Sequence, residues 1–148
     1  MKRRQFIQQS GRGVAGLWAA SALSRSLTLG QAPPSERIRV GFVGVAGRAG
    51  RLLQDFADQP DVVVSRLAEI DPRRVPGALK TLADRNRPTP IVSTDFRRLL
   101  DDPRIDALVV GTPDHWHAIP TILGCLAGKD VYVEKPDGHN MLEGQRMV

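Results

Sequence analysis

The sequence predicts an α/β domain built on a doubly wound parallel sheet. Between residues 37 and 148, five short apolar segments alternate with segments of helical periodicity. The apolar segments are nearly continuous, which is typical of parallel strands that are buried on both faces and joined by helical crossovers. Ligands of such a sheet bind at the carboxyl ends of its strands.

Each expected strand is a run of β-branched and other apolar residues bounded by turn-forming residues. The five strands cover residues 37–45, 61–70, 90–93, 105–113 and 130–136. The last one ends in the tripeptide EKP at residues 134–136, which places an acid, an amine and a proline at the carboxyl end of the strand.

The expected helices alternate with these strands. They cover residues 46–60, 71–85, 94–103, 117–128 and 140–148. In the first helix, Leu52, Leu53 and Phe56 share one face, and a similar apolar face begins at Val75 in the second. Pro60 ends the first helix.

The later helices are recognised by their ends. Thr94 or Ser93 is a suitable N-cap for the third helix. Gly128 ends the fourth helix. Pro120 is compatible with that helix only if it starts near residues 117–118.

The charge of the chain is unevenly distributed. It carries 21 Lys and Arg residues and 16 Asp and Glu residues, a formal net charge of +5. Five basic residues and no acidic ones lie in residues 1–32, so the remaining residues are formally neutral. Because the body lacks the electrostatic footprint of a nucleic-acid binder, no nucleic-acid partner is expected.

The single cysteine, Cys125, excludes an internal disulfide bond. It lies in an apolar helical segment and is expected to be a small buried side chain. A catalytic thiol would need a base nearby in space, which the sequence does not show.

Residues 1–32 have the layout of an export signal, with a basic start, an apolar run at residues 13–23, and then polar and small residues. The run is too short for a membrane span, which needs about 20 apolar residues. The tetrapeptide RRQF at residues 3–6 resembles the twin-arginine export motif, which predicts a periplasmic or otherwise exported protein. A basic tail or an uncleaved anchor is the alternative.

Two cleavage sites are compatible with the leader, one after Ala32 and one after Ala22. Pro33 follows the first of these and disfavours cleavage there. After cleavage no stable membrane span is expected. A proline-rich linker at residues 33–37 then leads into the domain at residues 38–148.

The turn after the first strand, VGFVGVAGRAG, is an imperfect dinucleotide fingerprint. Aligned on Gly44, its three positions hold Gly44, Ala46 and Ala49, which serve the turn, the approach to the pyrophosphate and close helix packing. Ala46 departs from the pattern because its methyl group faces the phosphate. Gly47 restores room, Arg48 adds positive charge, and the following helix offers free N–H groups to an anion. A glycine turn without nucleotide is the alternative.

An acid follows where the fingerprint requires one. Glu69 lies 25 residues after Gly44, at the end of the second strand, where an acid accepts hydrogen bonds from the adenosine ribose. Asp71 competes for this role, but it is better placed to cap the next helix. A carboxylate here repels a 2′-phosphate, so the sequence favours NAD as the cofactor. NADP is the alternative, because Arg73 and Arg74 are close in the sequence.

The loop GTPDHWHA after the fourth strand turns the chain where the sheet presents its ligand. Asp114, His115 and His117 supply metal-ligand types within four residues, but closed zinc sites draw their ligands from separated segments, so no metal site is expected. Two interpretations remain. The one we favour is a loop that contacts a bound cofactor, and the other is a His117 bonded to backbone at a helix start.

The order of VGFVGVAGR, GTPDHWHAIP, KDVYVEKP and HNMLEG resembles the N-terminal half of the Gfo/Idh/MocA oxidoreductases, over about residues 37–148. The resemblance implies a Rossmann-type NAD(P)-binding domain and, after it, an α/β substrate domain that this chain lacks. It also implies a sheet that is incomplete at its C-terminus, one strand short of six. The implied reaction is hydride transfer from a sugar or polyol CH–OH group to nicotinamide.

The resemblance also assigns site residues. It implies that Lys135 is the catalytic lysine beside the nicotinamide, that Glu134 and Pro136 complete its motif, and that the Lys-Pro bond is often cis. The implied residues that border the cofactor are Thr112, Pro113 and His115. A lysine can polarise an alcohol oxygen or pass a proton. Direct pairing with Glu134 would oppose that role, so the Glu134 side chain is expected to point elsewhere.

Three functions are compatible with the sequence. The first is the NAD(P)-binding portion of an exported sugar or polyol oxidoreductase. This chain is expected to be inactive by itself, because no substrate domain encloses the site around Lys135. The second is a stand-alone dinucleotide-binding module, and the third is a non-enzymatic periplasmic interaction protein.

Overall fold

The computed structural model describes residues 37–148. The expected export signal at residues 1–32 and the linker up to residue 36 lie outside the described residues. In the described part of the chain, no helix is long and apolar enough to cross a membrane.

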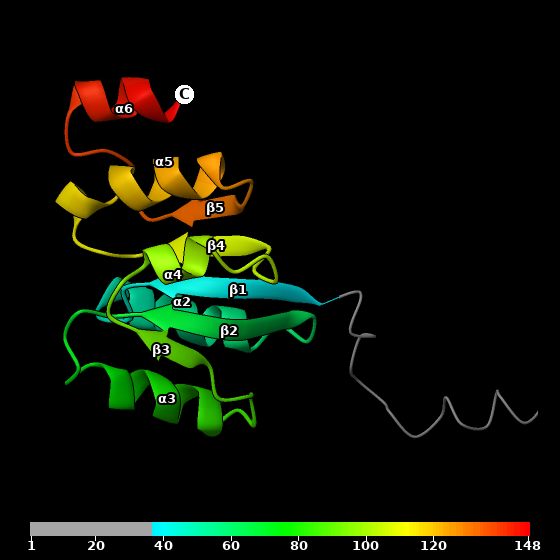
Figure 1. The fold of residues 1–148 in the computed structure, drawn as a ribbon. Helices are drawn as coiled ribbons and strands as arrows, with labels where there is room; N and C mark the ends of the chain where they lie inside the picture. Colours follow the sequence, from blue (N-terminus) through cyan, green and yellow to red (C-terminus); the bar gives the residue numbers. More distant parts are fainter. Residues whose placement is uncertain (1–36) are drawn as a thin grey trace, which may run out of the picture. The chain divides into compact units, whose positions relative to one another are not determined.

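Five parallel strands form one sheet in the order β3-β2-β1-β4-β5 (Figure 1). They are β1 (Ile38–Val43), β2 (Val62–Ala68), β3 (Ile91–Ser93), β4 (Ala107–Val110) and β5 (Asp130–Val133). The chain moves outward from β1 to β3 and then crosses to β4 on the other side of β1. This confirms the doubly wound parallel sheet, and its strand order reverses between β1 and β4.

The helices occur where the sequence predicted them, and each is shorter than its predicted segment. They are α2 (Arg48–Ala57), α3 (Val75–Ala83), α4 (Arg97–Leu100), α5 (Ala118–Leu126) and α6 (Met141–Met147). Because α5 starts at Ala118, Pro120 falls in its first turn, where proline is tolerated. A short 3₁₀ helix, η3 (Asp114–Trp116), precedes α5 and was not predicted.

The core occupies both faces of the sheet, because neighbouring residues of a strand point to opposite sides. On one face, Phe42 and Val109 pack with Leu53 of α2 and Leu82 of α3. On the other face, the buried cluster consists of Val43, Ala68, Leu99, Ile105, Leu108 and Val110. Burial on both faces explains why the strands are continuous apolar runs in the sequence.

The expected cap of α4 was wrong. Phe96 occupies the N-cap position, and it makes no side-chain cap bond. Instead, Ser93 Oγ accepts a hydrogen bond from the Asp95 N–H at 3.0 Å, and Asp95 Oδ1 accepts one from the Arg97 N–H at 3.0 Å. These local bonds compete with helix formation, so α4 begins three residues after Thr94.

The expected burial of Cys125 was also wrong, because its side chain is exposed. The residues that α5 buries are Ala118, Pro120, Thr121 and Gly124. A Cβ on Gly124 would lie 2.9 Å from side-chain atoms of Leu108 and Val131, so the helix backbone packs closely on β4 and β5 there. Cys125 follows this contact position and therefore falls on the solvent side of the helix.

Asp102 ties the loop before β4 to the sheet. Its carboxylate accepts hydrogen bonds from Arg104 Nε at 3.0 Å and from Arg66 Nε at 2.6 Å, and the residue is 7% exposed. These donors, Arg104 first, hold the pKa of Asp102 well below its ordinary value. A lowered folded-state pKa contributes stability above the unfolded pKa of about 3.9. That contribution is lost as the pH falls toward the folded value.

We therefore expect Asp102→Ala to lower the free energy of unfolding by about 2 kcal/mol at pH 7, since it leaves the largely buried Arg66 unpaired. Urea unfolding measures this change. The control is Asp84→Ala, which removes an exposed ion pair with Lys80 and should cost little. Equal costs for the two variants would contradict the assignment, and the expected difference should shrink in strong acid.

Candidate functional site

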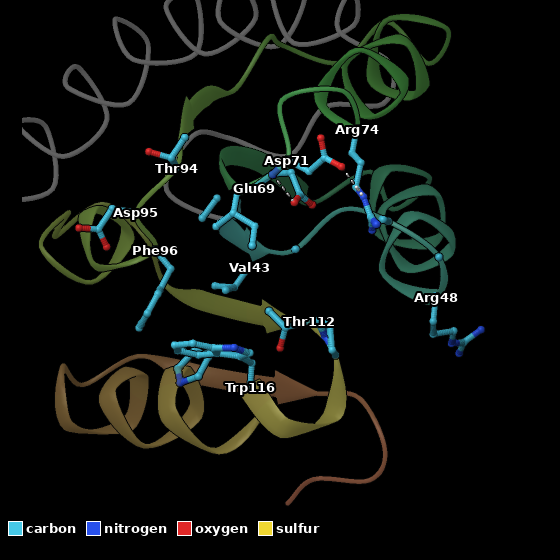
Figure 2. A pocket seen from close by; sticks show the side chains of 18 of the residues that line it. Val43, Arg48, Glu69, Asp71, Arg74, Thr94, Asp95, Phe96, Thr112 and Trp116 are labelled. Carbon is cyan, nitrogen blue, oxygen red and sulfur yellow. Dashed lines mark hydrogen bonds and ion pairs between the residues drawn. The ribbon is translucent and has the colours of Figure 1, made fainter. Parts of the chain in front are cut away.

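A cavity of about 750 Å³ lies at the carboxyl ends of the strands (Figure 2). Residues that follow β1, β2, β3 and β4 line it. Figure 2 shows Glu69 and Asp71 on one side of this cavity and Trp116 on the other. The cavity therefore occupies the edge of the sheet where doubly wound domains bind ligands.

Gly44 makes the turn out of β1 in a conformation that favours glycine. Its φ is +83°, and a Cβ there would lie 3.1 Å from the carbonyl oxygen of Gly111. Its N–H donates to the Ala68 carbonyl at 2.8 Å. Gly47, with φ of +56°, is the N-cap of α2 and provides no side-chain cap. The first turn of α2 thus has N–H groups that no side chain caps, which is the arrangement that binds anions.

The other fingerprint positions have distinct surroundings. Ala46 lines the cavity. Ala49 is fully buried, and a Cβ on Gly111 would come within 2.6 Å of its Cβ. Ala49 thus packs against the end of β4, which is the close helix–strand contact that the third position of the fingerprint permits.

Glu69 is buried and lines the cavity. One carboxylate oxygen accepts the N–H of Val45 at 3.1 Å, and the other accepts the N–H of Asp71 at 3.0 Å. The side chain therefore joins the glycine turn to the loop after β2, a role that the sequence did not predict. Its predicted contact with a ribose remains a prediction.

Asp71 does not cap α3, contrary to expectation. That helix begins at Val75, and its N-cap position is Arg74. Asp71 instead pairs with Arg73 and Arg74, and it also lines the cavity.

Arg48 joins the start of α2 to the end of β5. Its Nε donates to Glu134 Oε1 at 2.9 Å, and Glu134 Oε2 accepts the N–H of Lys135 at 3.3 Å. The hydrogen bond from Arg48 is the main reason that the pKa of Glu134 is lowered. The Glu134 side chain thus pairs with Arg48, as expected if it points away from the Lys135 amine.

His117 connects two loops through backbone carbonyls. Its Nδ1 lies 2.6 Å from the Pro136 oxygen and its Nε2 lies 2.7 Å from the Thr112 oxygen, and the residue is 2% exposed. The alternative interpretation, a histidine bonded to backbone, is therefore the correct one for His117. In the described part of the chain, no group of three or more His, Cys, Asp or Glu side chains is arranged to hold a metal ion.

The rest of that loop faces the cavity. Its lining residues there include Thr112, Pro113, His115 and Trp116. Thr112 Oγ1 is buried and has no hydrogen-bond partner among the described residues. A buried hydroxyl without a partner at a cavity wall fits a site that is completed by a polar ligand.

Lys135 is exposed and follows the end of β5. The cavity wall does not include it, nor its neighbours Glu134 and Pro136. The Lys135–Pro136 peptide bond is cis, as the resemblance implied. Arg48 and His117 contact the two flanking residues, so this segment is attached to the start of α2 and to the start of α5.

Residues 38–148 match the family described as "Oxidoreductase family, NAD-binding Rossmann fold", GFO_IDH_MocA. The chain belongs to this family. The expected cofactor, NAD, is thereby confirmed, and the positive φ of Gly44, the uncapped start of α2 and the unpartnered Thr112 hydroxyl fit a dinucleotide.

Among curated relatives, glycosyl hydrolase family 109 protein 1 of Shewanella sp. strain MR-4 and the alpha-N-acetylgalactosaminidase of Shewanella oneidensis are both 30% identical to this chain. Each alignment covers 90% of this chain and 33% of the relative, so the chain spans about a third of their length.

Solved structures show the same fold. Levoglucosan dehydrogenase in complex with NADH has a TM-score of 0.66 at 25% identity, over 75% of this chain and 31% of that one. Myo-inositol dehydrogenase from Lactobacillus casei, in complex with NAD(H) and myo-inositol, has a TM-score of 0.66 at 21% identity, over 75% and 32%.

Proposed function

We propose that this chain is the NAD-binding domain of an exported oxidoreductase that acts on a CH–OH group of a sugar or polyol. The observation that supports this proposal is the attachment of the Glu134–Pro136 segment to the start of α2 and to the loop after β4. Arg48 contacts its acid and His117 contacts its proline. Arg48 itself lines the cavity, and His117 also contacts the carbonyl of Thr112, which lines it too. The Lys135 backbone is therefore attached on both sides to the cavity wall.

Alcohol oxidation needs a hydride acceptor and a group that handles the hydroxyl proton. Bound NAD supplies the acceptor. As an ammonium group, Lys135 can polarise the alcohol oxygen by donating a hydrogen bond to it, and as the neutral amine it can accept the hydroxyl proton. Because Lys135 is exposed, its side chain is accessible to a substrate that is held from the outside of this domain.

A redox-neutral reaction is the second candidate, favoured by the names of the Shewanella relatives. Glycoside hydrolysis involves no net oxidation, so any hydride taken from the sugar must be returned to it. The two candidates therefore differ in one observable, because an oxidoreductase accumulates NADH and a glycosidase does not.

Chimeras separate these candidates. Residues 38–148 would replace the equivalent segment of levoglucosan dehydrogenase and, separately, of the Shewanella oneidensis alpha-N-acetylgalactosaminidase. We expect levoglucosan-dependent NADH formation by the first chimera and none by the 148-residue chain alone. Glycoside cleavage without NADH accumulation, seen only in the second chimera, would favour the glycosidase. NADH binding without turnover in either would favour a stand-alone dinucleotide-binding module.

Export is proposed on the sequence of the leader. A reporter fused to residues 1–32 is expected to reach the bacterial periplasm, because the RRQF motif precedes a short apolar run. Arg3→Lys combined with Arg4→Lys should block this export, as measured by reporter activity in periplasmic extracts. Equal export of the double variant would reject the twin-arginine route.

A further inference from the structure

Two arginines precede α3, and both pair with Asp71. Arg73 donates from Nε to Oδ1 at 2.9 Å and from Nη2 to Oδ2 at 2.9 Å, while Arg74 Nε donates to Oδ2 at 3.3 Å. The pair with Arg73 is bidentate, which is also the geometry by which a guanidinium group binds a phosphate. Each Asp71 oxygen therefore already accepts from a cationic donor.

These charges lie beside the adenosine end of the predicted cofactor site. Asp71 and Arg74 line the cavity together with Glu69, and Figure 2 shows Asp71 between Glu69 and Arg74. The ribose of a dinucleotide is bound at the end of the second strand of such a sheet, which here is the end of β2. NAD and NADP differ only at this ribose, through the 2′-phosphate.

A second hollow of about 460 Å³ adjoins the first, between α2 and α3. Arg51, Arg73 and Arg74 line it, and no described acidic residue does. Arg74 lines both hollows, as do residues of the glycine turn. The residues that line both hollows are Ala46, Gly47 and Arg74, so a phosphate at their boundary would meet the Arg74 guanidinium group and backbone of the glycine turn.

The two carboxylates are held differently. Glu69 accepts two backbone N–H groups and is buried, so it is part of the loop framework. The Asp71 side chain is 21% exposed, and it accepts one backbone N–H, from Arg73 at 3.1 Å. Its remaining contacts are the two arginines, which are the groups that a 2′-phosphate would need.

We propose that Asp71 sets the cofactor preference of this site by occupying the guanidinium groups of Arg73 and Arg74, which would otherwise bind the 2′-phosphate of NADP. The inference rests on the proposed function and identifies the residue that makes its cofactor site selective. Hydrogen bonds from Arg73 are the main cause of the lowered pKa of Asp71, so the carboxylate stays ionised at neutral pH.

The test is calorimetric titration of the full chain and its Asp71→Asn variant with NADH and with NADPH. Asparagine retains an oxygen for the Arg73 N–H but loses the charge that holds both arginines. NADPH affinity should rise by about tenfold to a hundredfold, the value of a charge-assisted hydrogen bond. NADH affinity should change little, which also reports that the variant is folded.

A matched control carries the same charge change. Asp58 lines neither hollow, and it pairs with Arg85 Nε at 2.7 Å. Asp58→Asn should leave NADPH affinity unchanged, and adding Arg73→Ala and Arg74→Ala to Asp71→Asn should remove the gain.

The outcomes are separable. Unchanged NADPH affinity in Asp71→Asn, with NADH binding intact, would overturn this inference alone. An equal gain in Asp58→Asn would assign the effect to overall charge and would also overturn it. If the unmodified chain binds neither nucleotide, the proposed function fails, and the inference fails with it.

Discussion

Replacing Lys135 with alanine in the levoglucosan dehydrogenase chimera is expected to lower kcat by about 10²- to 10⁴-fold, the range for loss of a general acid–base group. NADH affinity should be nearly unchanged, because the cavity wall does not include Lys135. Steady-state kinetics and NADH titration of the same preparation measure both effects. The two readouts separate a chemical role of the amine from a role in cofactor binding.

The control for this variant is Lys80→Ala, which removes an exposed lysine of α3. It should leave both kcat and NADH affinity unchanged. Normal turnover of the Lys135→Ala chimera would contradict the catalytic role of the Glu134–Pro136 segment. A matching loss of NADH affinity would instead indicate that Lys135 holds the cofactor.

Glu69→Ala should have the second large effect. It removes the acceptor for the N–H groups of Val45 and Asp71, both of which belong to loops that line the site. Leaving such groups without a partner costs about 1–3 kcal/mol each, so the free energy of unfolding should fall by about 2–6 kcal/mol. If the carboxylate also holds the ribose, NADH affinity should fall by about a hundredfold, as one charged hydrogen-bonding group contributes.

Glu69→Gln is the matched variant for this prediction. It keeps the side-chain shape and one acceptor oxygen, so it should retain one backbone bond and lose about half as much stability. Urea unfolding and NADH titration, both done where each variant is folded, report the two effects separately. If Glu69→Ala bound NADH as tightly as the unmodified chain, Glu69 would not be the ribose ligand.

The sheet could be predicted from the sequence because its signals are local. Continuous runs such as residues 37–45 indicate strands buried on both faces, and the spacing of Leu52 and Leu53 indicates the apolar face of α2. The cap of α4 was missed because Ser93 and Asp95 make short-range hydrogen bonds that compete with helix capping. Local patterns did not decide between these two uses of the same side chains.

The contacts that assemble the site could not be predicted, because they join residues far apart in the chain. Arg48 and Glu134 are separated by 86 positions, and His117 reaches a carbonyl 19 positions away. The motif that contains Glu134 was recognisable, but its partner was not. Similarly, the fingerprint indicated Glu69 as a ribose ligand, while its backbone bonds to Val45 and Asp71 depend on how β1 and β2 pair.

Calorimetric titration of the 148-residue chain and of its Gly44→Val variant with NADH tests whether the cavity binds the cofactor. The unmodified chain is expected to bind NADH saturably in a one-to-one ratio. Gly44→Val should abolish that binding, because a side chain at φ of +83° is strained and its Cβ would lie 3.1 Å from the Gly111 oxygen. No heat of binding for either NADH or NADPH, or equal NADH binding by a folded Gly44→Val variant, would contradict the assignment of the cavity as the cofactor site.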